Sequence, residues 1–382
     1  MTDLRLDEMR LLERAREFAQ LHVAPQAAHW ARERLTCAQL FPLAASVGLL
    51  GLQIPASHGG SAMSFACKAQ VAEILAAADF GVAMSLINTH NVAKQVATLG
   101  QSSLVQRFVP GLIAGRISAC TALTEPTAGS DFSAIQTQAV AVPGGWQLDG
   151  SKTWITNAVH ADVIVVYAQT RVGAGAAGIA AFIVDTHRSG FHLARGDAMG
   201  PLSSMGTGEF QLTGYLCEED ELLSPAGEAF KDILGAINGA RAYVAAMCCG
   251  MVGECLRVAS AYGLQRKTFG KNLLAHQGWR WQLADAAIDL EAAQLMVRHT
   301  ATLIDTGMDA QSACAKAKVF STRMAQRHIT ALMHSMGAEG LREEFPFVRH
   351  LAASQVAGLV DGSTEMLLER IAKDFKASSS SR

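Results

Sequence analysis

Apolar positions at the start of the chain recur at helical spacing. From Leu6 to about Gly115 the apolar stretches end at Pro25, Gly48 and Gly100, where we expect helices to stop. Four apolar residues spaced three apart open this region: Met9, Leu12, Ala15 and Phe18. The first third of the chain is therefore predicted to be helical.

The spacing changes between about Ile117 and Glu219. Short stretches rich in β-branched or aromatic residues alternate there with Gly, Pro and Asp, a pattern typical of strands and turns. The predicted strands lie in TQAVAV, WQLDG, DVIVVYAQT, GIAAFIVDT, FHLARG and EFQLTGYL. We expect a β domain between two helical ones.

Long helical patterns return after Pro225. They lie in FKDILGAINGARAYVAAMCCGMVGECLRVASAYGLQRK, WQLADAAIDLEAAQLMVRHTATLI and CAKAKVFSTRMAQRHITALMHSM. One face of the second helix is predicted to pack inside an antiparallel bundle through Leu283, Ala284, Ala287, Ile288 and Leu295. The predicted fold class is α+β multidomain, with an N-terminal helical domain at 1–118, a middle β domain at 119–225, a C-terminal helical bundle at 226–376 and a mobile polar tail at 377–382.

Composition adds an expectation about partners. The chain has 382 residues, 50% hydrophobic and 17% charged, with a mean hydropathy of +0.19, so we expect buried cores and further surface buried between subunits of a homo-oligomer. A net charge of −2 gives no general attraction to nucleic acid or anionic lipid. We therefore expect no nucleic acid and no membrane among the partners.

The cysteines and the N-terminus favour a cytoplasmic location. The eight cysteines form no C-x-x-C pair and have no histidines at zinc-ligand spacing, so they are interpreted as buried thiols in a reducing compartment, with no metal site. The opening MTDLRLDEMR lacks the basic and then apolar order of a signal peptide. No stretch approaches about 18 uninterrupted apolar residues.

One glycine-rich motif is a weak signal. GAGAAG at 173–178 fits the dinucleotide-binding spacing, but the residues that follow are predicted to form a strand, where that fingerprint requires a helix. We interpret it as a hairpin loop.

Two polar segments are candidates for a lined site. TALTEPTAGSD at 121–131 gathers hydroxyl groups around Gly129, which lets backbone approach a ligand closely, although a well-capped loop explains it equally well. SKTWITNA at 151–158 is predicted to place Trp154 and Thr156 on the same side of a strand. Such a pair suits a flat heteroaromatic ring, whereas a tryptophan anchoring a β core is the commoner case.

Charged residues mark two further segments. RKTFGK at 266–271, followed by His276 and Gln277, places cations at a helix end, where they either offset the helix dipole or reach a phosphate. GLVDGSTEM at 358–366 contains Asp361 directly before Gly362. Asp-Gly is a common turn dipeptide, so the alternatives for Asp361 are a turn former and a base.

Taken in order, these segments resemble the acyl-CoA dehydrogenase family along almost the whole chain. The resemblance implies a helical domain, a β-barrel-like domain and a four-helix bundle, assembled as a homodimer or homotetramer. It implies FAD as cofactor, an acyl-CoA or acyl-carrier-protein substrate, and an electron-transfer flavoprotein as oxidant. The GSTEM ending also resembles members that act on carrier-protein-bound acyl groups.

The resemblance also assigns roles to residues. Asp361 falls where the family places its catalytic carboxylate, usually Glu, which would take the α-proton of the thioester while a hydride leaves the β-carbon for flavin N5. Arg241, Gly362 and Ser130 fall in substrate-binding positions. The implied cofactor-binding residues are Thr124, Gly129, Ser130, Trp154, Thr156, Arg266, Thr268, Phe269, Ser363 and Glu365, of which Arg266, Thr268 and Phe269 would reach the FAD of a neighbouring subunit.

The shorter Asp side chain keeps alternatives open. Losing one methylene withdraws the carboxylate by about 1.3 Å, where a misplacement of about 1 Å can cost 10²-fold in rate. An apolar pocket is expected to raise its pKa and strengthen it as a base. The alternatives are a flavin oxidase or monooxygenase of the same fold that uses O2, and a non-catalytic flavoprotein that serves as a binding module.

Overall fold

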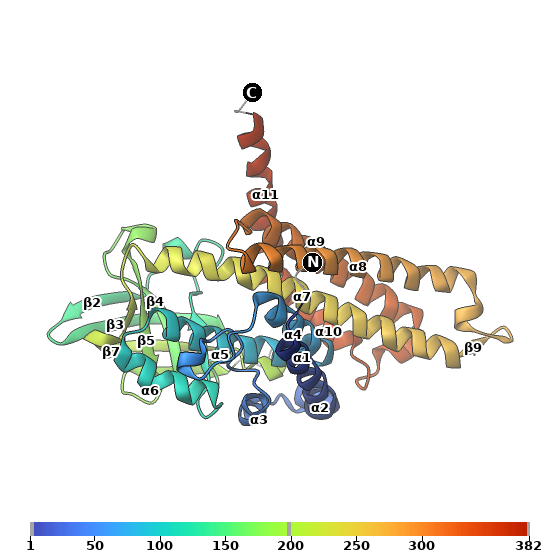
Figure 1. Ribbon diagram of the computed structural model, residues 1–382, viewed down its shortest axis with the longest axis horizontal. Coiled ribbons are helices and arrows are strands. Elements are labelled where there is room, and N and C mark those ends of the chain that lie inside the picture. Colours follow the sequence, from blue (N-terminus) through green and yellow to red (C-terminus); the bar gives the residue numbers. More distant parts are fainter. Residues whose placement is uncertain (1–3, 197–199, 380–382) are drawn as a thin grey trace. The chain divides into compact units, whose positions relative to one another are not determined.

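The computed structural model describes residues 4–196 and 200–379, with only the backbone of Arg195 and of residues 376–379. Its helices, labelled in Figure 1, are α1 Leu6–Phe18, α2 Ala24–Glu33, α3 Phe41–Ser46, α4 Phe65–Ala78, α5 Phe80–Leu99, α6 Ser102–Ile113, α7 Ala229–Gln265, α8 Gln277–Asp305, α9 Gln311–Ser335, α10 Phe347–Leu359 and α11 Thr364–Ser379. Its strands are β1 Ala119–Ala122, β2 Gln138–Val142, β3 Gly145–Ile155, β4 Val163–Gln169, β5 Ile179–Asp185, β6 Phe191–Gly196, β7 Gly208–Glu218, β8 Leu222–Ser224, β9 Lys267–Thr268 and β10 Lys271–Asn272. The helical, β and helical order is confirmed. Helix α11 includes the first three residues of the expected tail, and residues 380–382 lie outside the described part.

The contacts divide the chain into two compact units. The first comprises Met1–Glu33, Phe65–Ala83 and Ile237–Arg382, and the second comprises Arg34–Ser64 and Met84–Ala236. Each unit therefore combines segments that are distant in sequence.

The second unit is built on an eight-stranded sheet. The strand order is β6-β7-β3-β2-β4-β5-β8, and β1 pairs in parallel with β4. Strand β4 is buried at every residue, so its apolar run is continuous rather than alternating. All six predicted strands are present as β2 to β7, and GAGAAG lies in the hairpin between the antiparallel β4 and β5. The short strands β1 and β8 were not predicted.

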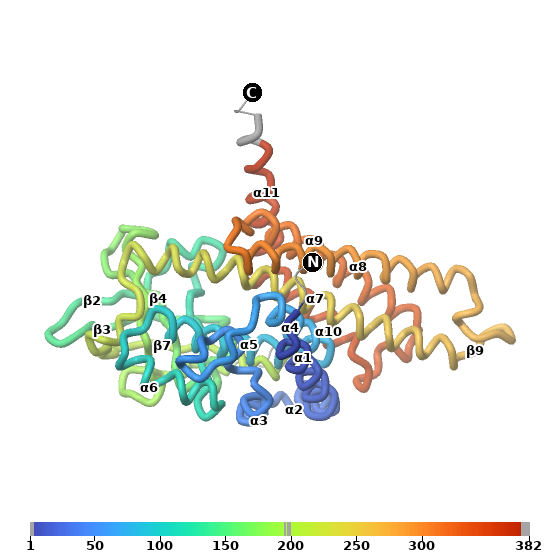
Figure 2. The backbone as a smooth tube through the Cα atoms, in the orientation of Figure 1, coloured from blue at the N-terminus to red at the C-terminus, as the bar shows by residue number. Residues whose placement is uncertain are grey.

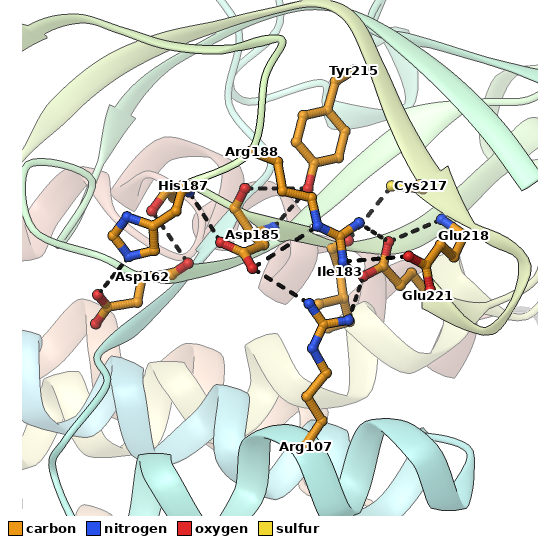
Figure 3. Close-up of polar contacts among 11 residues, drawn as sticks. Arg107, Asp162, Ile183, Asp185, His187, Arg188, Tyr215, Cys217, Glu218 and Glu221 are labelled. Atoms are coloured by element: carbon orange, nitrogen blue, oxygen red, sulfur yellow. Dashed lines mark hydrogen bonds and ion pairs between the residues drawn. The ribbon is translucent and has the colours of Figure 1, made fainter.

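A polar network around the buried Glu221 joins helix α6 to this sheet (Figure 3). The side chain of Glu221 is fully buried and accepts hydrogen bonds from Arg188 at 2.8 and 2.5 Å and from Arg107 of α6 at 3.0 Å. Arg107 also reaches Asp185 at 3.4 Å. Two cations thus compensate the burial of one carboxylate, which would otherwise be strongly destabilising.

The helices of the first unit pack as a bundle, in which α8 and α9 run side by side (Figure 2). The α8 face buried in this chain carries Ala286, Ala293, Val297, Thr300 and Ala301. The predicted packing face was wrong, because Ile288 is 65% exposed and Leu295 is 55% exposed. Small residues fill the intramolecular contact, and the larger apolar ones lie on the outer surface.

The prediction of a helix end at Pro25 was also wrong. Helix α1 passes into a π-helical turn, Ala19–Val23, and α2 begins at Ala24. The helix is continuous through Pro25. In the π-helical turn the Ala24 N–H bonds Ala19 O, so the bonding pattern shifts directly before the residue that lacks an N–H.

Helix α7 meets the length and hydropathy criteria for crossing a membrane. In its most apolar window, however, 67% of the residues are buried inside the protein. A core helix of a bundle passes the same test, so this feature is weak evidence for a membrane span.

Candidate active site

Asp361 lies in a short turn between α10 and α11, which we call the base loop (residues 360–363). Its backbone has φ 53°, and that of Gly362 has φ 94°, so two successive residues adopt the left-handed region. Glycine tolerates this region freely, and aspartate tolerates it better than most residues. Asp361 is therefore a turn former, and the question is what its side chain does there.

Two cations from different helices hold the carbonyl oxygens of the base loop. Lys318 of α9, which is 1% exposed, donates to Val360 O and to Gly362 O, the latter at 2.6 Å. Arg241 of α7 donates through Nε to Asp361 O at 3.0 Å. The loop thus has three successive carbonyl groups bonded to protein cations.

The carboxylate of Asp361 is half-buried and accepts no hydrogen bond from any residue that the structure describes. Burial raises the pKa of Asp361 above its ordinary value, and the charges of Lys318 and then Arg241 partly oppose that rise. Burial also lowers the pKa of Lys318 to about 8, against the effect of Asp361. The expected direction of the Asp361 shift is confirmed.

In the second unit, Trp154 lies near the end of β3. The predicted strand alternation of Trp154 and Thr156 was wrong, because Trp154 has φ 58°, the pairing with β7 shifts register between Lys152 and Ile155, and Thr156 follows the strand in a turn. The indole is 59% exposed, so it is not a core anchor. The half-buried Thr156 hydroxyl has no hydrogen-bond partner among the described residues.

The loop at residues 124–131 lies beside this segment. Thr153 N donates to Thr124 O at 3.0 Å, and Lys152 Nζ bonds the Glu125 carboxylate at 2.7 Å and Leu123 O at 3.0 Å. Both members of the ion pair are buried. Thr124 is half-buried, and the exposed Gly129 and Ser130 follow it, with open space where a Cβ on Gly129 would lie.

The basic segment after α7 forms a small hairpin of β9 and β10, the cationic hairpin (residues 266–272). Its turn holds Phe269 at φ 50° and Gly270 at φ 78°, and the Phe269 side chain is 97% exposed. Thr268 contacts His276, whose Nε2 lies 3.1 Å from Thr268 O. No hydrogen bond or ion pair between described residues joins this hairpin to the base loop.

The structure gathers the predicted residues into separate groups. Arg241, Asp361 and Gly362 lie together, with Ser363 next in the loop and the exposed Glu365 in the first turn of α11. Thr124 adjoins the strand that carries Trp154, and Arg266, Thr268 and Phe269 share the hairpin.

Three buried polar residues that support these groups were not predicted from the sequence. Lys318 shares a helical face with Cys314 and Thr322, which are both buried, and a lysine on such a face is a signal for a specific partner. Lys152 pairs with Glu125. Asn157, at φ 67°, donates to Ser85 O at 2.9 Å and Ala119 O at 3.0 Å, fixing the end of the Trp154 segment.

The residues of the second unit fit a flat ring such as a flavin. They combine the exposed indole of Trp154, the unbonded hydroxyl of Thr156 and the open surface at Gly129. Aromatic faces with a few placed polar groups are typical of cofactor sites.

Comparison with known proteins defines the class. The same order of domains, helical, β and helical, recurs in the solved structure of butyryl-CoA dehydrogenase from Megasphaera elsdenii. That structure matches with a TM-score of 0.93 and 28% identity, over 98% of this chain and 99% of that chain. A structure titled electron transferring flavoprotein of Acidaminococcus fermentans matches with a TM-score of 0.94 and 28% identity, over 98% and 99% of the two chains. The structure titled PigA with FAD and proline shares the fold, with a TM-score of 0.92, 24% identity and the same coverage.

Family models give the assignment within that class. The N-terminal, middle and C-terminal domains of acyl-CoA dehydrogenase match residues 6–116, 120–215 and 227–375. The chain belongs to the acyl-CoA dehydrogenase family. It is an FAD-dependent oxidoreductase that acts on CH–CH bonds.

Proposed function

We propose that this chain dehydrogenates acyl thioesters at the 2,3-position and that Asp361 is the base that takes the α-proton. The observation that carries the assignment is a half-buried carboxylate without a described hydrogen-bond partner, in a loop held by two cations. The raised pKa of Asp361 supports it, because it makes the carboxylate a stronger base than an ordinary aspartate.

The chain's own residues bind, orient and deprotonate the thioester. When bound, FAD supplies the acceptor for the hydride that leaves the β-carbon. The Asp361 carboxylate receives the α-proton and becomes a neutral acid, while the electrons of that C–H bond form the new C=C bond. The Asp361 backbone N–H donates to the thioester oxygen as negative charge develops there. Arg241 holds the base loop through Asp361 O, and together with Gly362 it is proposed to line the substrate-binding site.

We further propose that two segments of the second unit hold the flavin ring. Trp154 offers its exposed face and Thr156 its hydroxyl, while Thr124, Gly129 and Ser130 offer polar and backbone groups. The buried pair of Lys152 and Glu125 keeps these segments together.

The remaining cofactor contacts are proposed to come from a second copy of this chain. The exposed Phe269, with Arg266 and Thr268 beside it, supports a role outside its own subunit. Ser363 and Glu365 are proposed to contact the cofactor at the start of α11. Assembly as a homo-oligomer would then complete the site.

The oxidant and the location are also proposals. An electron-transfer flavoprotein is the proposed electron acceptor, in keeping with the similarity to the Acidaminococcus fermentans structure. The eight buried thiols are compatible with the cytoplasm. Either CoA or a carrier protein would present the acyl group.

Anaerobic bleaching of the flavin tests this function. Purified protein is mixed with a panel of acyl-CoAs and acyl-carrier-protein thioesters of different length and branching, and the flavin absorbance is followed before and after air is admitted. We expect bleaching by at least one thioester and slow recovery in air. Fast recovery with peroxide release would indicate an oxygen-using enzyme, and no bleaching by any CoA or carrier-protein thioester would contradict the proposal.

A further inference from the structure

Lys318 and Arg241 together bind the carbonyl oxygens of Val360, Asp361 and Gly362. The lysine comes from α9, 42 positions before Val360, and the arginine comes from α7, 120 positions before Asp361. Such convergence of cations on one short loop exceeds what is needed to end α10, because a single cation near the last carbonyl groups serves that purpose.

The contact between Lys318 and Val360 O also fixes the direction of the Asp361 N–H group. The C=O of Val360 and the N–H of Asp361 belong to one planar peptide, and none of the described peptide bonds is cis, so the two groups point in opposite directions. Since Lys318 binds Val360 O, the Asp361 N–H points away from the ammonium group. That N–H donates to no acceptor among the described residues.

The positive charge of Lys318 also polarises the peptide that it orients. A hydrogen bond from an ammonium group to a carbonyl oxygen is stronger than one between neutral groups, and bonds in series polarise one another. The peptide between Val360 and Asp361 is therefore both fixed and polarised, and its N–H becomes a better donor.

We propose that Lys318 is a positioning residue that aims and polarises the Asp361 N–H toward the thioester oxygen. This inference rests on the proposed function, because it takes the base loop as the place where the thioester is deprotonated. Lys318 touches no reacting atom and acts only through the peptide whose carbonyl oxygen it binds.

Ionisation of bound acetoacetyl-CoA tests the proposal apart from hydride transfer. This 3-keto thioester forms a stable enolate by losing its acidic proton, and the enolate absorbance gives the pH at which the bound ligand ionises. In Lys318→Met we expect that pH to rise by roughly one unit or more, equivalent to about tenfold weaker preference for the enolate. Anaerobic flavin reduction by a substrate thioester is expected to slow by roughly 10²-fold.

Three further variants separate the possible failures. Lys316→Met removes an exposed lysine two positions away on α9 and should leave both measurements unchanged. Asp361→Asn should lose flavin reduction yet still ionise bound acetoacetyl-CoA, because its N–H and Lys318 remain. Lys318→Gln serves if Lys318→Met fails to fold or to bind FAD, because glutamine keeps hydrogen-bond donors but carries no charge. We expect it to raise the ionisation pH of bound acetoacetyl-CoA in the same direction, but by less.

The proposal is overturned if a folded, FAD-loaded Lys318 variant ionises acetoacetyl-CoA at the wild-type pH. The base assignment fails independently if Asp361→Asn reduces its flavin at the wild-type rate, whatever the Lys318 variants do.

Discussion

The ion pair of Lys152 and Glu125 is buried in the second unit, and each side chain is at most 4% exposed. Glu125 also accepts from Thr137 Oγ1 at 2.5 Å and from the backbone N–H groups of Gln136 and Thr137. Removing one member of a buried pair leaves an uncompensated charge, which costs more than the pair itself contributes.

We predict that Lys152→Met lowers the free energy of unfolding by roughly 3–5 kcal/mol. Denaturant unfolding measures the change. Lys231→Met, which removes an exposed lysine from α7 in the same unit, is the matched control and should change stability little. Equal effects of the two substitutions would show that the pair contributes nothing specific.

The same pair sets a pH dependence. Burial alone would raise the pKa of Glu125, but its ion pair with Lys152 and its hydrogen bonds bring it below the ordinary value of 4.5. The folded protein then holds this proton less tightly than the unfolded chain, so the contribution is present above pH 4.5 and is lost as the pH falls further.

Among the helices, α7 crosses α4 closely at Gly250. A Cβ atom on Gly250 would lie 2.0 Å from the backbone oxygen of Glu73, whereas one on Gly253, a turn later, would meet only the Leu290 side chain at 3.8 Å. The sequence gives both positions the same helical pattern, and only the crossing distinguishes them.

We predict that Gly250→Ala destabilises the protein by about 2 kcal/mol or more, because backbone cannot move away cheaply. Gly253→Ala should instead be neutral or stabilising by up to roughly 1 kcal/mol, since alanine favours the helix. Thermal and denaturant unfolding of the two variants measure both effects. A tolerated Gly250→Ala would contradict the close crossing.

The outer face of α8 carries Trp281, Ile288 and Leu295 at seven-residue spacing, exposed at 60%, 65% and 55%. Such spacing places the three on one stripe, as in helices that pack against another chain. We propose that a second copy of this chain packs against the stripe, which agrees with the proposed homo-oligomer.

We predict that Ile288→Glu shifts the protein toward smaller species, because a charge is costly inside an apolar contact. Analytical ultracentrifugation measures the shift. Val172→Glu, at an exposed loop position, is the control. An unchanged sedimentation profile for Ile288→Glu would remove α8 from the interface.

Element types were predictable where the apolar spacing is unambiguous, as in β2 to β7 and in α7 to α9. The errors arose where local exceptions decide the geometry. Pro25 is accommodated by a π-helical turn, and the bulge at Trp154 breaks the strand alternation. The exposed stripe of α8 has the same apolar pattern as a core face, so spacing alone could not assign it.

Across the whole molecule all eight cysteines are buried, and no disulfide links the described residues. Burial raises the pKa of Cys314 to about 11 and of Cys67 and Cys248 to about 12. Thiols that are both shielded and protonated react slowly with disulfide reagents.

We predict that an aromatic disulfide reagent titrates essentially none of the eight thiols in the native holoprotein and all eight in denaturant. The release of the coloured thiolate measures both numbers. A thiol that reacts rapidly in the native protein would contradict the burial, and its identity by mass spectrometry would locate the error.

At this scale the sequence identified Asp361 and its neighbours in the loop but not the residue that holds them most firmly. Lys318 reaches the base loop through a contact between segments 42 residues apart, and Arg241 through one 120 residues apart. Apolar spacing along the chain does not specify which distant segments meet. A buried lysine could be noticed from its helical face, but its partners could not.

The proposed function depends on removal of the α-proton by the Asp361 side chain. The most direct measurement is the rate of anaerobic flavin reduction by a saturating acyl thioester in Asp361→Asn and Asp361→Glu, each checked for bound FAD. The Asn variant is expected to keep its flavin but to be reduced at least roughly 10²-fold more slowly, whereas the Glu variant is expected to retain measurable reduction. Reduction of the Asn variant at the parent rate would leave Asp361 as a turn former only.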